Sequence, residues 1–201
     1  MVEKSHGNYD LSFKYLAQAG RVYPLLKVVP FMQSILYLLL GDYARGWRLY
    51  ESRFEQADGK SRKLDAAISE PLCVAQINNK RLLVYDEQGA GDIIMMLRYI
   101  PLLADICQVT VVAPLPIVPL IQAQNWPCAV TGRYDGKSAD FDFAVPIMSL
   151  PRLFSATPAN IPPSPYLRAP EPLRPKGGPL RVGLAWSGNP EQTENGLRSI
   201  S

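Results

Sequence analysis

Two patterns of hydrophobic and polar positions divide the chain near residue 65. From about Leu11 to Gln56 the apolar residues recur at the three- and four-residue spacing of helices that bury one face. Gly41-Asp42 interrupts this spacing, and a glycine followed by an aspartate is typical of a turn. The pattern therefore predicts a helical hairpin, two antiparallel helices, within residues 1–65.

From Lys80 onward, short apolar runs alternate with helical patterns, which indicates βαβ units and a parallel sheet. Nearly continuous apolar strands are expected when helices cover both faces of such a sheet. Residues 66–156 are thus predicted to form a Rossmann-like α/β domain whose ligand crevice lies at the carboxyl ends of its strands. The predicted strands are Leu82–Tyr85, Val109–Ala113, Ala129–Thr131 and Phe143–Pro146, and the predicted helices are Asp92–Ala104, Pro116–Gln124 and Ser149–Ser155.

A proline-rich stretch follows the predicted sheet. Prolines recur at 158, 162, 163, 165, 170, 172, 175 and 179, and few residues between them can continue a helix or a sheet ladder. Residues 157–179 are therefore predicted to be a linker. The strand-like run Leu180–Trp186 comes next, and one isolated strand cannot pair its backbone groups. We expect residues 180–201 to be the start of a truncated second domain.

Composition narrows the functional classes. The 201 residues are 47% hydrophobic and carry a net charge of +3 without basic blocks, which argues for a buried core and against nucleic acid as a partner. The longest apolar stretch falls short of the roughly 20 residues of a membrane helix, so no membrane span is predicted. Cys73, Cys107 and Cys128 are too widely spaced for a zinc site or a disulfide framework, so a cytoplasmic location is predicted.

The junction between the strand Leu82–Tyr85 and the next helix is the main candidate for chemistry. Backbone N–H groups and the positive end of a helix dipole gather there, which favours anions and a charged Asp92. Gly89 and Gly91 supply two glycines of the dinucleotide fingerprint, but Ile94 replaces the third. A nicotinamide site is therefore disfavoured, and we expect no cofactor. Spacing alone leaves Asp92 open as a reactive carboxylate or as a helix cap.

Other candidate chemistry is weaker. His6 is the only histidine, so no Ser-His or Cys-His catalytic pair can be built. Asp140-Phe-Asp142 spells the D-x-D of metal-dependent sugar transferases, but polar residues at the mouth of a strand are ordinary. Hard cations need several further oxygen ligands, and none can be assigned, so no metal site is predicted.

Several segments, in order along the chain, are similar to bacterial tetratricopeptide-repeat proteins with a heptosyltransferase-like glycosyltransferase region. The E-Q-G-x-G-D and W-x-G-N-P segments are fairly specific together. The segments are Gly41–Glu51, Tyr85–Ile93, Arg98–Pro101, Ser149–Pro151, Pro165–Ala169 and Val182–Pro190.

The helical hairpin resembles a single tetratricopeptide repeat. Ser34 and Tyr37 take the small and aromatic positions of the first helix, and Gly46 and Tyr50 take those of the second. An ordinary packed hairpin is the alternative, because a solenoid needs about three stacked repeats.

The resemblance implies a GT-B architecture, in which two Rossmann-like domains face each other across a cleft. The first would hold a sugar or protein acceptor, and Asp92 matches the general base of inverting, metal-independent transfer. Glu87 and Gln88 would orient the acceptor, with a core-facing or capping role as the alternative. Gly89 and Gly91 would let the backbone approach the ligand.

The second domain would hold the nucleotide-sugar donor. Ser187, Gly188 and Asn189 match the residues around the donor diphosphate, with Arg198 as the cationic partner. Because most of such a donor site would lie after Ser201, we expect this chain to be inactive alone.

A noncatalytic protein-interaction module is the alternative function, in which the hairpin binds a protein partner and the sheet is its scaffold. A hydrophobic groove on the hairpin aromatics would favour that interpretation, although aromatic residues at helical spacing commonly belong to the core. These aromatics are Tyr37, Tyr43, Trp47 and Tyr50.

Overall fold

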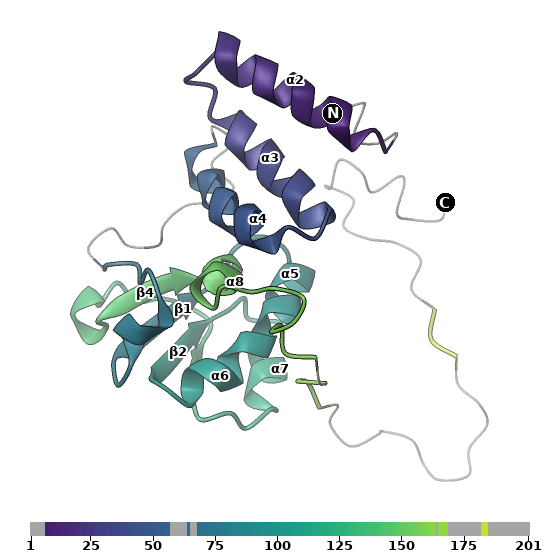
Figure 1. The fold of residues 1–201 in the computed structure, drawn as a ribbon. Coiled ribbons are helices and arrows are strands. Elements are labelled where there is room, and N and C mark those ends of the chain that lie inside the picture. Colours follow the sequence, from purple (N-terminus) through teal and green to yellow (C-terminus); the bar gives the residue numbers. More distant parts are fainter. Residues whose placement is uncertain (1–6, 57–63, 65–67, 164, 169–181, 185–201) are drawn as a thin grey trace. The chain divides into compact units, whose positions relative to one another are not determined.

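The computed structural model describes residues 7–56, 64, 68–163, 165–168 and 182–184. The chain divides into two compact units, residues 1–168 and 169–201. Every helix and strand named below belongs to the first unit (Figure 1). This unit combines α-helices with a four-stranded parallel sheet, so the expected α/β class is confirmed.

Three helices, where two were expected, precede the sheet. They are α2 (Tyr9–Val22), α3 (Val28–Leu39) and α4 (Tyr43–Tyr50), and the 3-10 helix η1 (Glu51–Glu55) continues α4. The expected turn at Gly41-Asp42 is present: Gly41 has a φ of +83°, and Asp42 Oδ1 accepts from the Arg45 N–H at 3.1 Å. The break between α2 and α3 was not expected. α2 ends just before Tyr23, because Pro24 disfavours a helical conformation in the residue that precedes it.

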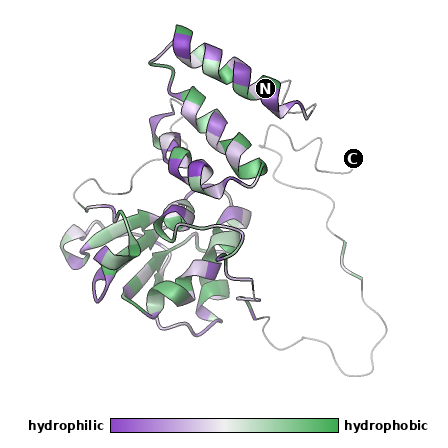
Figure 2. Cartoon of the chain, in the orientation of Figure 1, coloured by the Kyte–Doolittle hydropathy of each residue, from purple (hydrophilic) through white to green (hydrophobic). Residues whose placement is uncertain are grey.

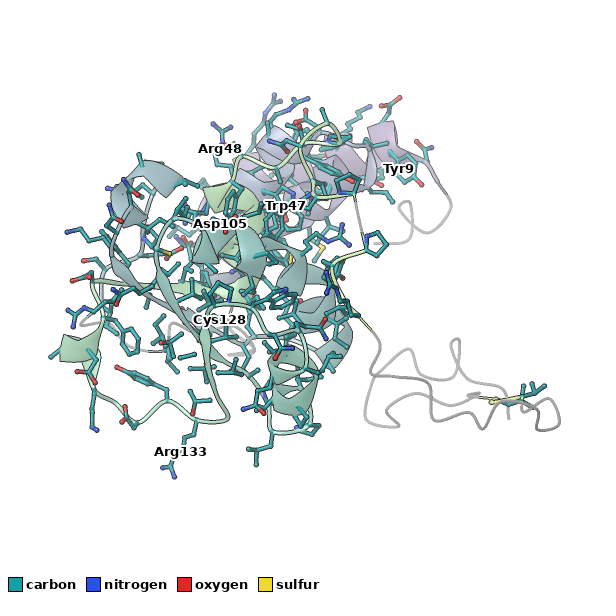
Figure 3. All side chains as sticks on the ribbon, turned by 90° about the horizontal axis from the view of Figure 1, so that it is seen from below. Tyr9, Trp47, Arg48, Asp105, Cys128 and Arg133 are labelled. Atoms are coloured by element: carbon teal, nitrogen blue, oxygen red, sulfur yellow. The ribbon has the colours of Figure 1, made fainter. Side chains whose placement is uncertain are left out.

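The helices pack through aromatic and small residues. The rings of Phe13 on α2 and Tyr37 on α3 lie 4.8 Å apart. Where α3 meets α4, a Cβ on Gly46 would lie 2.6 Å from Leu38 Cδ2, so only a glycine fits this crossing. Trp47 lies among other side chains, whereas Arg48 projects outward (Figure 3).

The sheet is parallel throughout, with the order β3-β2-β1-β4. Val84 of β1 is in register with Val111 of β2 and Val145 of β4. The strands are mainly hydrophobic, whereas α2 alternates hydrophobic and hydrophilic residues (Figure 2). The strands are β1 (Arg81–Tyr85), β2 (Gln108–Val112), β3 (Ala129–Thr131) and β4 (Phe143–Pro146), so each expected strand is found to within a residue at its ends.

The helices after the strands are shorter than expected. The predicted helix over 92–104 is divided into α5 (Ala90–Met96), the 3-10 helix η3 (Leu97–Tyr99) and α6 (Ile100–Ala104). Pro101 explains the division, because it lacks the N–H that would bond to the carbonyl four residues earlier. The other described elements are α7 (Val118–Gln122), α8 (Leu150–Leu153) and the 3-10 helices η2 (Val74–Ile77), η4 (Ser138–Asp140) and η5 (Ile147–Ser149).

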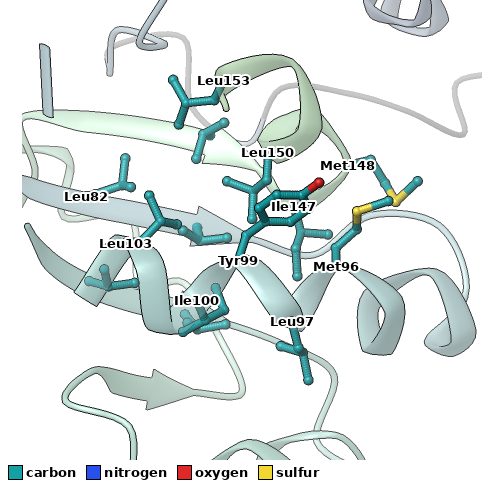
Figure 4. Packing of buried hydrophobic residues seen from close by; sticks show 14 of the residues in the cluster. Leu82, Met96, Leu97, Tyr99, Ile100, Leu103, Ile147, Met148, Leu150 and Leu153 are labelled. Carbon is teal, nitrogen blue, oxygen red and sulfur yellow. The ribbon is translucent and has the colours of Figure 1, made fainter. Parts of the chain in front are cut away.

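The main core lies on one face of the sheet. Leu82 and Val84 point into it and meet side chains of α5, α6, α7 and α8. Tyr99 lies beside Ile147, and Met96 lies beside Met148 (Figure 4). Helices and 3-10 helices that are separate in the sequence are therefore joined by one buried apolar cluster.

The opposite face of the sheet, where helices were also expected, is covered by a loop and a short 3-10 helix. Leu83 and Tyr85 point to a small cluster that contains Ile68 and the partly buried Tyr134 and Phe141. A right-handed crossover from β3 back to β4 must pass over this face, because the chain reverses its direction across the sheet there. That connection is a loop with the short η4, so the expectation of helices on both faces was wrong for the described residues.

Candidate functional site

The loop after β1 brings the sequence-predicted residues to the carboxyl edge of the sheet. Gln88 has a φ of +62°, a left-handed conformation that turns the chain before α5. Asp92, in the first turn of α5, accepts the Gly89 N–H through Oδ2 at 3.1 Å. Its Oδ1 has no hydrogen-bond partner in the part of the chain that the structure describes. Asp92 therefore caps the helix with one oxygen and keeps the other available.

The two glycines of the loop differ in their surroundings. A Cβ on Gly89 would lie 3.2 Å from Asp92 Oδ2, so a side chain there would press on the capping carboxylate. A Cβ on Gly91 would meet no described atom within 4 Å. Gly91 also lacks a positive φ, so neither packing nor backbone conformation within the described residues requires glycine there.

Glu87 is buried beneath this loop and binds an arginine of the helical part. Arg53 Nε donates to Glu87 Oε1 at 2.7 Å, and Arg53 Nη2 donates to Oε2 at 2.9 Å. The two side chains are 2% and 3% exposed. Because the arginine occupies both carboxylate oxygens, the contacts favour the core-facing alternative for Glu87 over contact with an acceptor.

Arg53 uses its remaining donors on nearby oxygens. Nη1 donates to Tyr50 O at 3.2 Å and to Glu51 Oε1 at 3.0 Å, and Nη2 also donates to Ser149 Oγ at 2.7 Å. The guanidinium carbon lies 4.1 Å from the centre of the Phe54 ring. A planar, always charged guanidinium suits such a site, since five N–H groups and two faces can all be used.

The group of side chains that contact Arg53 extends to a second arginine, Arg152. Ser149 Oγ lies 2.9 Å from Glu51 Oε1, and Arg152 Nε lies 3.5 Å from Glu51 Oε2. Burial raises the pKa of the Glu51 carboxyl above its usual range, while Arg53 and Arg152 oppose the increase. We refer to Glu51, Arg53, Glu87, Ser149 and Arg152 as the Arg53 cluster.

Sheet topology gives the Arg53 cluster its significance. The strand order reverses between β1 and β4, and ligands of open α/β sheets bind outside the carboxyl ends of strands at such a reversal. Glu87 follows β1, Ser149 follows β4, and Arg53 hydrogen-bonds to both. A side chain of the protein itself thus lies where this topology would predict a ligand.

Sequence reasoning missed Arg53, although one signal was present. Gly46, Tyr50 and Arg53 follow one another at spacings of four and three, so they share one face of a helix. Gly46 and Tyr50 were expected to face the neighbouring helix, and Arg53 extends that buried face.

One residue of the helical part contacts the loop after β1 directly. Gln88 Nε2 donates to the Tyr50 hydroxyl at 2.6 Å. Burial raises the pKa of the Tyr50 hydroxyl; the Gln88 hydrogen bond opposes this increase, and the negative charges of Glu87 and Asp92 add to it. Tyr50 therefore stays protonated. Tyr50, Gln88 and Asp92 together form a rim of polar groups from two parts of the fold, here called the β1 rim.

A hollow in the described surface lies elsewhere. It has a volume of about 610 Å³ and is lined at the amino ends of the strands by Arg81, Gln108, Ala129 and other residues. Ligand sites of open parallel sheets lie at the opposite, carboxyl ends. We therefore place the candidate site at the β1 rim and not in this hollow.

The D-x-D segment is engaged in structural contacts. Asp142 Oδ2 accepts the Arg81 backbone N–H at 2.8 Å, and Oδ1 accepts from Arg81 Nη2 at 3.2 Å. The hydrogen bonds from Arg81 lower the pKa of the Asp142 carboxyl. These contacts support the interpretation that the aspartates are ordinary polar residues at the start of a strand. Across the described ranges, no group of three or more His, Cys, Asp and Glu side chains is placed to hold a metal ion.

The expected donor-side residues Ser187, Gly188, Asn189 and Arg198 lie outside the described residues, as does His6. Within the described residues, none of the helices has the length and apolar character needed to cross a membrane. Comparisons with known protein families, with curated proteins and with solved structures find no match to this chain.

Proposed function

We propose that this chain is the acceptor-side part of a GT-B-type, nucleotide-sugar-dependent glycosyltransferase, with Asp92 as its general base. The observation that carries the proposal is the position of Asp92: it lies at the carboxyl edge of a parallel sheet, with one oxygen fixed by the Gly89 N–H. Its other oxygen is unpartnered among the described residues. Glu87, the other acid of the motif, is fully engaged by Arg53.

The proposed reaction is a single displacement. As an acceptor hydroxyl oxygen forms its bond to the anomeric carbon, Asp92 takes the hydroxyl proton. The bond from the anomeric carbon to the diphosphate oxygen breaks, and its electron pair leaves with the nucleoside diphosphate. Attack from the face opposite the leaving group inverts the anomeric configuration. In this proposal Ser187, Gly188, Asn189 and Arg198 contact the donor diphosphate.

The β1 rim offers groups that suit a sugar acceptor. Gln88 is exposed, and its Nε2 is held by the hydroxyl of Tyr50, which is itself only 6% exposed. This leaves the Gln88 amide oxygen as an acceptor to which a sugar hydroxyl can donate. The open space at Gly91 supports the proposal further, because the absence of a side chain lets a ligand approach the backbone closely.

The helical pair α3 and α4 fits a single tetratricopeptide-like repeat in this proposal. Ser34 is fully buried, and the Gly46 position has no room for a Cβ against Leu38. Both observations support small residues at the helix crossing. The ring contacts Phe31–Tyr50 at 5.8 Å and Trp47–Tyr50 at 5.5 Å fill the space between helices. Trp47 and Tyr50, two of the four aromatics of the alternative groove, thus pack against other rings, which supports a core role for them over the protein-interaction module.

Sugar binding tests the proposal. Saturation-transfer NMR with a panel of hexoses and heptoses, free and phosphorylated, is expected to detect binding to the wild-type chain. Asp92→Ala should weaken that binding roughly tenfold, as expected for loss of a charge-assisted hydrogen bond. Asp105→Ala is the matched control, because Asp105 is an exposed aspartate of the same domain. Absence of sugar binding, or equal binding by Asp92→Ala, would contradict the proposal.

A further inference from the structure

The turn between α2 and α3 exposes an uninterrupted group of residues. All residues from 21 to 27 are exposed, and four of them are large and apolar. Val22 is 60% exposed, Tyr23 64%, Leu25 86% and Leu26 42%. We refer to residues 21–27 as the α2–α3 turn. Single exposed apolar residues are ordinary, but contiguous ones indicate a contact surface.

The packing of the two helices does not use these side chains. Phe13 and Tyr37 hold α2 against α3, and Val29 Cγ1 comes within 3.5 Å of a Cβ placed on Gly20. Val29 is buried, whereas the turn residues before it are exposed. The turn lies at the end of the helices, on the side away from the strands (Figure 1). Its apolar side chains thus protrude from the fold instead of lining a groove.

The charged residues of the turn and of the sequence on both sides of it are basic, and the acid that lies against the turn is Glu55 of η1. Between Asp10 and Asp42 the sequence contains Lys14, Arg21 and Lys27 and no acidic residue. Lys14 and Arg21 are exposed and seven residues apart on α2, so they lie on the same side of that helix. Neither forms an ion pair with any described residue.

Lys27 is the exception among these cations. Its Nζ lies 2.8 Å from Glu55 Oε2, and both side chains are about half exposed. The charge available for an external partner therefore comes mainly from Lys14 and Arg21.

We propose that the α2–α3 turn docks on an anionic membrane surface. Leu25, Leu26 and Tyr23 would enter the interface between headgroups and acyl chains, while Lys14 and Arg21 contact lipid phosphates. A membrane fits better than a protein groove because the apolar group protrudes at a helix end and is bordered by cations. Reversible attachment follows, since a few buried side chains give only modest affinity.

Vesicle sedimentation tests the proposal with the intact chain. The wild-type chain is expected to bind phosphatidylcholine vesicles that contain phosphatidylglycerol, to bind pure phosphatidylcholine much more weakly, and to dissociate as salt increases. The double variant Lys14→Gln/Arg21→Gln should lower the partition coefficient roughly 25-fold, about fivefold for each basic residue. Leu25→Ser/Leu26→Ser should lower it roughly tenfold.

The control is Leu115→Ser, which removes another exposed leucine, 74% exposed, in the connection between β2 and α7. It should bind vesicles as the wild type does. The exposed positions of all variants predict unchanged melting temperatures, which circular dichroism checks. The proposal is overturned if the wild-type chain ignores anionic vesicles or if both double variants bind equally well. Self-association lost in Leu25→Ser/Leu26→Ser, without vesicle binding, would show a protein interface and also overturn it.

Discussion

Arg53 and Glu87, which are 34 residues apart in the sequence, form a bidentate ion pair with N–O distances of 2.7 and 2.9 Å. Arg53 follows α4, and Glu87 follows β1, so the pair joins the helical part to the sheet. It lies where the strand order reverses, which is where open α/β sheets commonly bind ligands. The chain fills this position with its own guanidinium, and the β1 rim, where we propose that an acceptor binds, lies beside it.

Removing one partner of the pair is expected to be costly. Arg53→Met leaves the buried carboxylate of Glu87 without its cation, and such losses typically cost about 3–5 kcal/mol. Urea unfolding should show this decrease in the free energy of unfolding. Arg53→Lys should also destabilise, because an ammonium cannot bridge both oxygens in the same plane. Lys27→Ala, which breaks an exposed pair with Glu55, is the control and should cost no more than about 1 kcal/mol.

A double variant separates the pair from its surroundings. Arg53→Met/Glu87→Leu removes both charges, so it should be more stable than Arg53→Met alone. If Arg53→Met unfolds at the same urea concentration as the wild type, the buried pair does not hold the helical part against the sheet.

Gly46 is expected to be intolerant of even a methyl group. In Gly46→Ala the new Cβ would meet Leu38 Cδ2 at 2.6 Å and the Leu38 backbone nitrogen at 3.1 Å. The side chain can move, but the backbone contact forces α3 and α4 apart, which costs about 1–3 kcal/mol. Thermal unfolding followed by circular dichroism measures the effect. A gain in stability, as helix propensity alone would give, would show that the crossing is looser than described.

The Arg81–Asp142 pair predicts a specific acid sensitivity. Because hydrogen bonds from Arg81 lower the folded pKa of Asp142, the pair stabilises the fold above the ordinary aspartate pKa of about 3.9. This contribution is lost as the pH falls through the lowered folded pKa. Asp142→Asn removes the titrating group, so its melting temperature should fall less steeply than that of the wild type below about pH 4. Parallel curves for the two proteins would contradict the assigned cause.

The same variant tests the D-x-D segment. If Asp142 serves only the strand mouth, Mn²⁺ should leave the melting temperature of the wild-type chain and of Asp142→Asn unchanged. A Mn²⁺-dependent stabilisation that Asp142→Asn abolishes would instead establish a metal site.

The sheet could be predicted from the sequence because its signal is local. Buried parallel strands need continuous apolar runs, and Leu82–Tyr85 and Phe143–Pro146 carry that signal alone. Helix limits were less accurate because single prolines, Pro24 and Pro101, decide them. The prediction that helices cover both faces failed for another reason: no pattern in the residues after β3 indicates that a loop, with Tyr134 among its side chains, replaces a crossover helix.

The candidate site shows the same limit. The glycine loop and Asp92 could be found from spacing, since both lie within one junction. The role of Glu87 could not, because its partner Arg53 is 34 residues away and an arginine after a helix ordinarily faces solvent. Only the folded structure shows that Glu87 is paired with Arg53, whereas Asp92 keeps one oxygen without a partner among the described residues.

Gly91 offers a way to test the site without unfolding it. Gly91→Ala places a methyl group in open space within α5, so it should leave stability unchanged or raise it by up to about 1 kcal/mol. The same methyl group should weaken sugar binding, because it occupies the path of a close ligand. Weaker binding together with lower stability would point to a damaged fold and not to a blocked site.

The most direct measurement is an amide chemical-shift map of the wild-type chain titrated with the sugars that bind it. If Asp92 belongs to an acceptor site, the shifts should concentrate at Gln88, Gly89, Gly91 and Asp92, and Gly91→Ala should reduce them. Shifts at Gln108 and Thr110, in the hollow at the amino ends of the strands, with none at the β1 rim, would contradict the account.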